Sequence, residues 1–102
     1  MDRIAILEAF IARAPADPFP RYGLAMELVA QGRTDDALAA FAALVEGTPD
    51  YLPTYLMYGN TLVQAGRKPE AADVFRRGMA LAARKGDGKT GGELEAALAE
   101  LG

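Results

Sequence analysis

The sequence predicts an all-α protein of about six helices in a single domain that covers residues 1–102. Three observations predict this fold class. Alanine, the residue with the highest helix propensity, is heavily over-represented. One segment of the chain repeats after 34 residues, a spacing typical of helical repeats. Residues that start and end helices flank segments of helical hydrophobic period, and no segment alternates as a strand would.

The repeat is clearest between residues 28–41 (LVAQGRTDDALAAF) and residues 62–75 (LVQAGRKPEAADVF). Chance would produce about one or two identities over such a length. Six positions are identical at the offset of 34, namely Leu28/Leu62, Val29/Val63, Gly32/Gly66, Arg33/Arg67, Ala37/Ala71 and Phe41/Phe75.

A weaker copy of the repeat covers residues 2–17. Asp2 and Pro15 lie 34 residues before Asp36 and Pro49. The first helix therefore looks like the second half of a repeat whose first half is missing. Between Asp2 and Pro15, four apolar residues match apolar residues in the next copy, in the pairs Ile4/Leu38, Leu7/Phe41, Phe10/Leu44 and Ile11/Val45.

Helix-starting residues set the expected element boundaries. Asp17 followed by Pro18 predicts a helix start, because the carboxylate serves as an N-cap and proline fits the first turn. Asp50 is expected to start the fourth helix in the same way, with Pro53 in its first turn. The expected helices cover residues 2–14, 18–31, 35–47, 51–65, 69–85 and 90–101.

Glycines and small residues explain how the helices pair. Gly32 and Gly66 end the helices before them, because glycine adopts the left-handed conformation of a C-terminal cap. Thr34 and Pro69 then open the second helix of each pair. Four small residues let the paired helices approach closely and two aromatic rings fill the space between pairs: Ala25, Gly59, Ala37 and Ala71, with Phe41 and Phe75.

The last expected helix, residues 90–101, is predicted to cover the end of the repeat array, because a terminal repeat otherwise exposes an apolar side. Thr90 and Glu93 match the capping-box pattern at its start. The opposite face of this helix is acidic. Its apolar residues fall on one stripe, formed by Leu94, Ala97, Leu98 and Leu101.

An aromatic stripe is expected on the fourth helix, where Tyr51, Tyr55, Tyr58 and Leu62 share one face. An aromatic platform for a ligand and packing on a neighbouring helix both account for the stripe, and packing is favoured.

The 34-residue period, with a glycine at the turn followed by alanine and an aromatic residue four positions later, resembles the tetratricopeptide repeat of small bacterial-type domains. The resemblance is strong over residues 18–84 and partial over residues 2–17. It rests on Leu24, Ala25, Leu28, Gly32, Ala37, Phe41 and Pro49 in one repeat and on Tyr55, Tyr58, Gly59, Leu62, Gly66, Ala71 and Phe75 in the next.

The resemblance implies antiparallel helix pairs that stack into a right-handed superhelix, with full repeats at residues 18–51 and 52–85. Three positions depart from the family's pattern. Arg21 stands where an aromatic residue is common, and Gly78 stands inside a helix where a small or aliphatic residue is usual. Ala83 replaces the closing proline, so the fifth helix is expected to continue.

The resemblance also implies a protein or peptide partner, bound along a concave groove lined by the first helix of each pair. This expected groove is mainly apolar and has no Lys or Arg, unlike the family members that clamp a carboxylate. It suits an amphipathic helix or an extended apolar peptide. The implied groove residues are Phe19, Tyr22, Met26, Val29 and Ala30 from the first repeat and Pro53, Leu56, Asn60, Val63 and Gln64 from the second.

The composition argues against catalysis and against several kinds of partner. The chain has no histidine, serine or cysteine, which removes the usual general base and the commonest nucleophiles. We therefore expect no enzyme activity, metal site or cofactor.

The net charge of −3 gives no general attraction to nucleic acid or to anionic membranes. The absence of cysteine and of an apparent secretory signal suggests a cytoplasmic location.

Two charged segments carry alternative interpretations. Residues 83–90 (ARKGDGKT) approach the phosphate-loop pattern, but the first glycine is replaced and a helix precedes the segment where that loop requires a strand. A flexible turn is favoured, with a weak anion site at the helix N-terminus as the alternative. The basic cluster is interpreted as solvated charge or as a contact to an acidic partner, and comprises Arg76, Arg77, Arg84 and Lys85.

Three functional hypotheses follow. The first is a protein-interaction module with an adaptor or scaffold role. The second is a self-associating structural repeat protein whose groove forms a homo-oligomer interface. The third and most remote is a nucleotide-binding or catalytic protein that uses the loop of residues 86–92 with Lys89 and Thr90.

Overall fold

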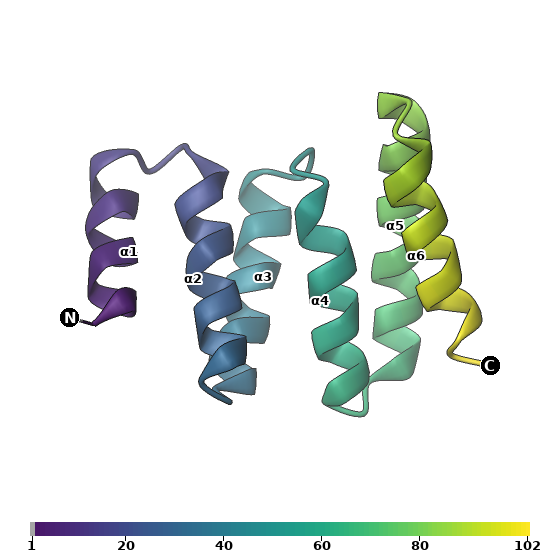
Figure 1. Cartoon of the computed structure of the whole chain (residues 1–102), viewed down its shortest axis with the longest axis horizontal. Helices are drawn as coiled ribbons and strands as arrows, with labels where there is room; N and C mark the ends of the chain where they lie inside the picture. The colour runs from purple at the N-terminus through teal and green to yellow at the C-terminus, as the bar shows by residue number, and fades with distance from the viewer. Residues whose placement is uncertain (1) are drawn as a thin grey trace. The chain divides into compact units, whose positions relative to one another are not determined.

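The computed structural model describes residues 2–102, which form six α-helices and no strand (Figure 1). The prediction of an all-α protein is confirmed, and every helix end lies within two residues of its expected position. The helices are α1 (Arg3–Arg13), α2 (Pro18–Ala30), α3 (Thr34–Gly47), α4 (Pro53–Gln64), α5 (Lys68–Lys85) and α6 (Gly88–Ala99).

The helices group into two compact units. The first runs to Tyr51 and contains α1, α2 and α3; the second runs from Leu52 to Gly102 and contains α4, α5 and α6. Within each unit, consecutive helices are antiparallel and pack on one another (Figure 1). The assignment of all 102 residues to a single domain stays a prediction.

Local capping chemistry sets most helix boundaries. The Asp17 carboxylate accepts a 3.0 Å hydrogen bond from the Phe19 N–H, and Pro18 occupies the first turn of α2 as expected. Gly32 and Gly66 have φ values of 74° and 77°, which confirms their left-handed conformation. Asp2 caps α1 by accepting a 3.0 Å bond from the Ile4 N–H.

Two expected caps are wrong. Asp50 does not cap α4, which begins at Pro53 with Leu52 at the N-cap and no side-chain hydrogen bond there. Leu52 is buried, so burial of an apolar side chain takes the place of a polar cap. Because α4 begins later than expected, Tyr51 lies outside it and is not part of an aromatic stripe on that helix.

The Thr90–Glu93 capping box is also wrong, because α6 begins at Gly88 with Asp87 as its N-cap. The Asp87 carboxylate accepts the Thr90 N–H at 3.0 Å and the Thr90 hydroxyl at 2.8 Å. These bonds, led by the one from the backbone N–H, lower the pKa of Asp87. Thr90 is therefore a donor to the cap.

The core of the first unit lies between α2 and α3, which pack against each other. Ala25 and Ala37 are completely buried, which fits the expected close approach of these two helices. Phe41 is also completely buried, and so are most of the other apolar residues on its side of α3.

The core of the second unit depends on glycines at helix crossings. A Cβ atom on Gly59 of α4 would overlap the ring of Phe75 on α5, so the ring packs directly on the backbone of α4. A Cβ atom on Gly78 of α5 would lie 2.6 Å from Cβ of Tyr55 and 3.0 Å from Cδ1 of Leu94. Gly78, an unusual residue for its position, therefore lets α4 and α6 both approach α5.

Thr54 of α4 is completely buried, and its hydroxyl has no hydrogen-bond partner. An unpaired buried hydroxyl costs about 1–3 kcal/mol. We therefore expect Thr54→Val, which keeps the shape, to raise the free energy of unfolding by about 1 kcal/mol in urea denaturation. Thr61→Val is the control, because the Thr61 hydroxyl donates to the Met57 carbonyl at 2.7 Å and should give no gain. Equal effects of the two variants would contradict this account.

Candidate protein-interaction surface

The predicted groove residues of the first unit lie on one face of α2. Phe19, Tyr22, Met26 and Val29 follow the three- and four-residue spacing of a helix face. The Phe19 side chain is 70% exposed, whereas the other three are half-buried. Ala30, at the end of α2, is exposed.

The predicted groove residues of the second unit lie on one face of α4. Leu56, Asn60 and Val63 are half-buried, and Gln64 and Pro53 are exposed. The structure thus gathers each set on its own helix. Because the two helices belong to different units, the assembly of both sets into a single groove stays a prediction.

Tyr22 packs on a second tyrosine of the first unit. Its ring meets Tyr51 edge-on, with ring centroids 5.7 Å apart and an interplanar angle of 63°. Burial raises the pKa of Tyr22, and the neighbouring Tyr51 adds to this effect. Tyr22 is therefore held against Tyr51 on the face formed by α2.

The seam between α1 and α2 holds two hollows that were not anticipated. The larger is about 480 Å³ and is lined by Arg3, Ile6, Leu7, Gly23, Met26, Glu27 and Ala30. The smaller is about 290 Å³ and is lined by Leu7, Phe10, Arg13, Ala14, Asp17, Phe19 and Pro20. The predicted groove residues Met26 and Phe19 each border one of them, so the apolar face of α2 continues onto α1.

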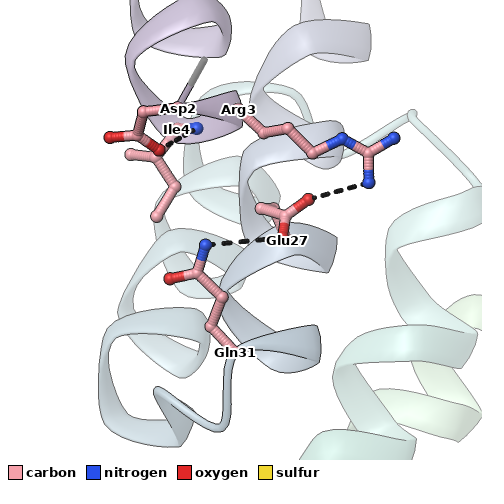
Figure 2. A network of polar contacts seen from close by, with 5 residues as sticks. All are labelled: Asp2, Arg3, Ile4, Glu27 and Gln31. Atoms are coloured by element: carbon pink, nitrogen blue, oxygen red, sulfur yellow. Dashed lines mark hydrogen bonds and ion pairs between the residues drawn. The ribbon is translucent and has the colours of Figure 1, made fainter.

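A polar network holds α1 against α2 beside the larger hollow (Figure 2). Glu27 of α2 accepts a bond from Arg3 of α1 at 3.3 Å on one carboxylate oxygen and from Gln31 at 3.4 Å on the other. Leu7 packs closely on the same helix, since a Cβ atom on Gly23 would lie 3.1 Å from its Cδ2. Hydrogen bonds and close packing therefore fix α1 against α2, and apolar side chains lie at the edges of this seam.

The exposed apolar residues concentrate on this unit. Among residues 2–102, the large hydrophobic side chains that are exposed are Ile6, Phe10 and Phe19, at 37%, 52% and 70%. Ile6 and Phe10 lie on α1, which was absent from the predicted groove. The half-repeat pattern of the sequence contained a signal for this exposed apolar surface on α1. Phe10 is apolar and stands at a repeat position that another helix has to cover.

Most of the glycine-rich segment of residues 86–92 lies within α6, which begins at Gly88 directly after Asp87. Asp87 already accepts the hydrogen bonds of Thr90 at the helix N-terminus, where an anion would have to sit. The hollow at this place includes Asp87 and Glu95 in its lining but not Lys89. This electrostatic environment argues against phosphate binding there.

Over residues 2–102, no three Asp or Glu side chains gather as metal ligands would. The basic cluster of α5, formed by Arg76, Arg77, Arg84 and Lys85, is exposed. Among residues 2–102, no helix is both long and apolar enough to span a bilayer.

Comparisons with known proteins agree with this geometry. Residues 28–85 match the model of a family described as tetratricopeptide repeat. The crystal structure of a tetratricopeptide repeat domain protein from Salinibacter ruber is 36% identical to this chain. That match covers 83% of this chain and 94% of the other, with a TM-score of 0.79. No curated protein matches the sequence.

Two further solved structures share the fold. A protein from Bordetella parapertussis is 26% identical over 99% of this chain and 88% of its own, with a TM-score of 0.83. The TPR2B domain of yeast Sti1, in a complex with pHsp70, has a TM-score of 0.89 over 96% of this chain and 78% of that one. Its 16% identity supports a likeness of fold alone.

Proposed function

The chain belongs to the tetratricopeptide-repeat family, and we propose that it binds an apolar segment of a protein partner on the exposed faces of α2 and α4. Tetratricopeptide repeats are protein-interaction modules, generally without catalytic activity. The proposed role is that of an adaptor or scaffold, with no chemistry of its own.

The observation that carries this proposal is the exposure of Phe19. A phenylalanine that is 70% exposed beside an apolar hollow of about 290 Å³ has no evident role in the core. Contiguous apolar surface of this kind usually marks an interaction site. Met26 and Leu56, both half-buried, would extend the contact along the two helices.

The shape and chemistry favour a helical or extended apolar segment as the ligand. The proposed face contains no Lys or Arg, and Asn60 and Gln64 are its side-chain amides. An amphipathic helix would present apolar residues at three- and four-residue spacing to such a surface. A ligand held mainly through a terminal carboxylate fits less well, because none of the groove residues of α2 and α4 is a cation and the one Arg in the hollow beside Phe19, Arg13, belongs to α1.

A displayed library of helical peptides, selected on the purified chain, tests the proposal. We expect selected peptides to carry an apolar stripe, and Phe19→Glu or Leu56→Glu to weaken their binding by about tenfold or more in calorimetry. Phe19 is highly exposed, so its variant should remain folded by circular dichroism.

Arg76→Glu and Arg77→Glu serve as controls on the exposed basic cluster of α5. They should change little beyond the salt dependence of binding. Loss of binding in the arginine variants, with normal binding by Phe19→Glu and Leu56→Glu, would move the interface to α5 and overturn the proposal.

A further inference from the structure

The side of α1 that borders the hollows at its seam with α2 has exposed apolar residues of the kind that are buried elsewhere in the same unit. Phe10 of α1 stands 34 residues before Leu44 of α3, which is 2% exposed, yet Phe10 is 52% exposed. Ile6 lies one turn before Phe10 and is also exposed. The repeat position that is buried in α3, at Leu44, is therefore exposed in α1, at Phe10.

Charges of opposite sign lie at the two ends of this side of the helix. Asp2, Ile6, Phe10 and Arg13 follow a spacing of about one turn and so share one side of α1. The Ile6 N–H donates to the Asp2 carbonyl at 3.2 Å, which places Asp2 one turn before Ile6. We call these four residues the α1 stripe.

Both charges of the stripe are available to a partner. Asp2 is exposed and uses one carboxylate oxygen, Oδ1, to cap α1. Arg13 is exposed and has no ion-pair partner within residues 2–102. The other charges of α1 lie elsewhere, since Arg3 is bonded to Glu27 and Glu8 points about half a turn away from the stripe.

We propose that two copies of this chain associate through the α1 stripe, with the two α1 helices antiparallel about a twofold axis. In that arrangement Asp2 of each copy lies opposite Arg13 of the other, and Ile6 lies opposite Phe10. A parallel arrangement would instead place like charges together. The stripe is therefore self-complementary, as a twofold interface requires.

This association uses α1, whereas the proposed partner-binding residues lie on α2 and α4, and the two surfaces meet at the hollow that Phe10 and Phe19 both line. A single helix of 11 residues forms a small contact, which predicts a weak dimer rather than an obligate one. Phe19 borders the hollow beside Phe10 and would contribute at the edge. Dimerisation would also double the number of binding faces in one assembly, which raises avidity for a partner with two copies of the ligand.

Sedimentation equilibrium of the purified chain tests the proposal. We expect a reversible monomer–dimer equilibrium with a dissociation constant below about 1 mM, weakened by about tenfold or more by Phe10→Asp. Arg13→Asp should also weaken the dimer, because Asp2 of each copy would then face a carboxylate at position 13 of the other copy. Arg84→Asp makes the same charge change on the exposed surface of α5 and should leave the dimer unchanged. A chain that stays monomeric at about 1 mM would overturn the proposal.

A charge exchange between two variants tests whether the charges of the α1 stripe pair across the interface. Asp2→Lys alone and Arg13→Asp alone should each dimerise poorly, since each brings like charges together at both ends. A mixture of the two should dimerise again, because opposite charges then meet at both ends. Circular dichroism of each variant checks that α1 remains folded. Failure of the mixture of folded variants to associate would exclude this pairing, even if the unmodified chain dimerises.

Discussion

Gly78→Val is expected to lower the free energy of unfolding by about 3 kcal/mol, at the upper end of overpacking costs. Any side chain at this position begins with a Cβ atom only 2.6 Å from Cβ of Tyr55. That atom is fixed to the backbone of α4, so a rotamer change cannot move it away. Leu94 of α6 lies on the other side, with Cδ1 at 3.0 Å. Urea denaturation followed by circular dichroism measures the loss.

The control for this variant is a glycine in open space. Gly92 lies within α6 and is exposed, and a Cβ atom there would meet no atom within 4 Å. Gly92→Ala should therefore stabilise the protein by about 1 kcal/mol through helix propensity alone. If Gly78→Val were as stable as the unmodified chain, the close crossing of α4, α5 and α6 at Gly78 would be wrong.

Boundaries that depend on local chemistry were predictable from the sequence. Asp17 followed by Pro18 specifies a helix start through a hydrogen bond that spans only two residues. Gly32 and Gly66 specify helix ends through their own backbone conformation. Such features need no knowledge of tertiary packing, and they account for the predicted start of α2 and the predicted ends of α2 and α4, which agree with the structure to within one residue.

The failed boundaries depended on choices that packing decides. Asp50 and Leu52 both preceded the fourth helix, and the buried apolar residue took the N-cap position. Thr90 was the predicted cap of the sixth helix, but Asp87 is the N-cap and its carboxylate accepts both donors of Thr90. The cap patterns of the sequence do not contain the burial or geometry that decides these two positions.

The candidate surface was predictable only in part. The resemblance to the family was enough to group Phe19 with Met26, and both residues lie on one face of α2. The exposure of Phe10 was not anticipated, since it depends on which helices cover α1. The role of Gly78 likewise required the positions of α4 and α6, which bring Tyr55 and Leu94 to the same point on α5.

Removal of residues 88–102, which contain α6, is expected to destabilise the second unit severely. Leu94 is completely buried, and full burial of a leucine contributes about 1.5–3 kcal/mol. The deletion also uncovers Ala82 of α5, which is 1% exposed in the intact chain. A loss of about 3 kcal/mol would lower the melting temperature by about 12 °C or more, and the truncated chain should aggregate on heating.

Two point variants separate the packing of α6 from the general effect of shortening the chain. Leu94→Ala should cost about 2–5 kcal/mol, because it leaves a cavity beside Gly78 at the crossing with α5. Leu98→Ala changes the same residue type one turn later, where the side chain is only half-buried, and should cost clearly less. Thermal denaturation of all three proteins ranks these effects. An unchanged melting temperature for both the deletion and Leu94→Ala would show that α6 is a tail that does not cover α5, contrary to the burial of Leu94.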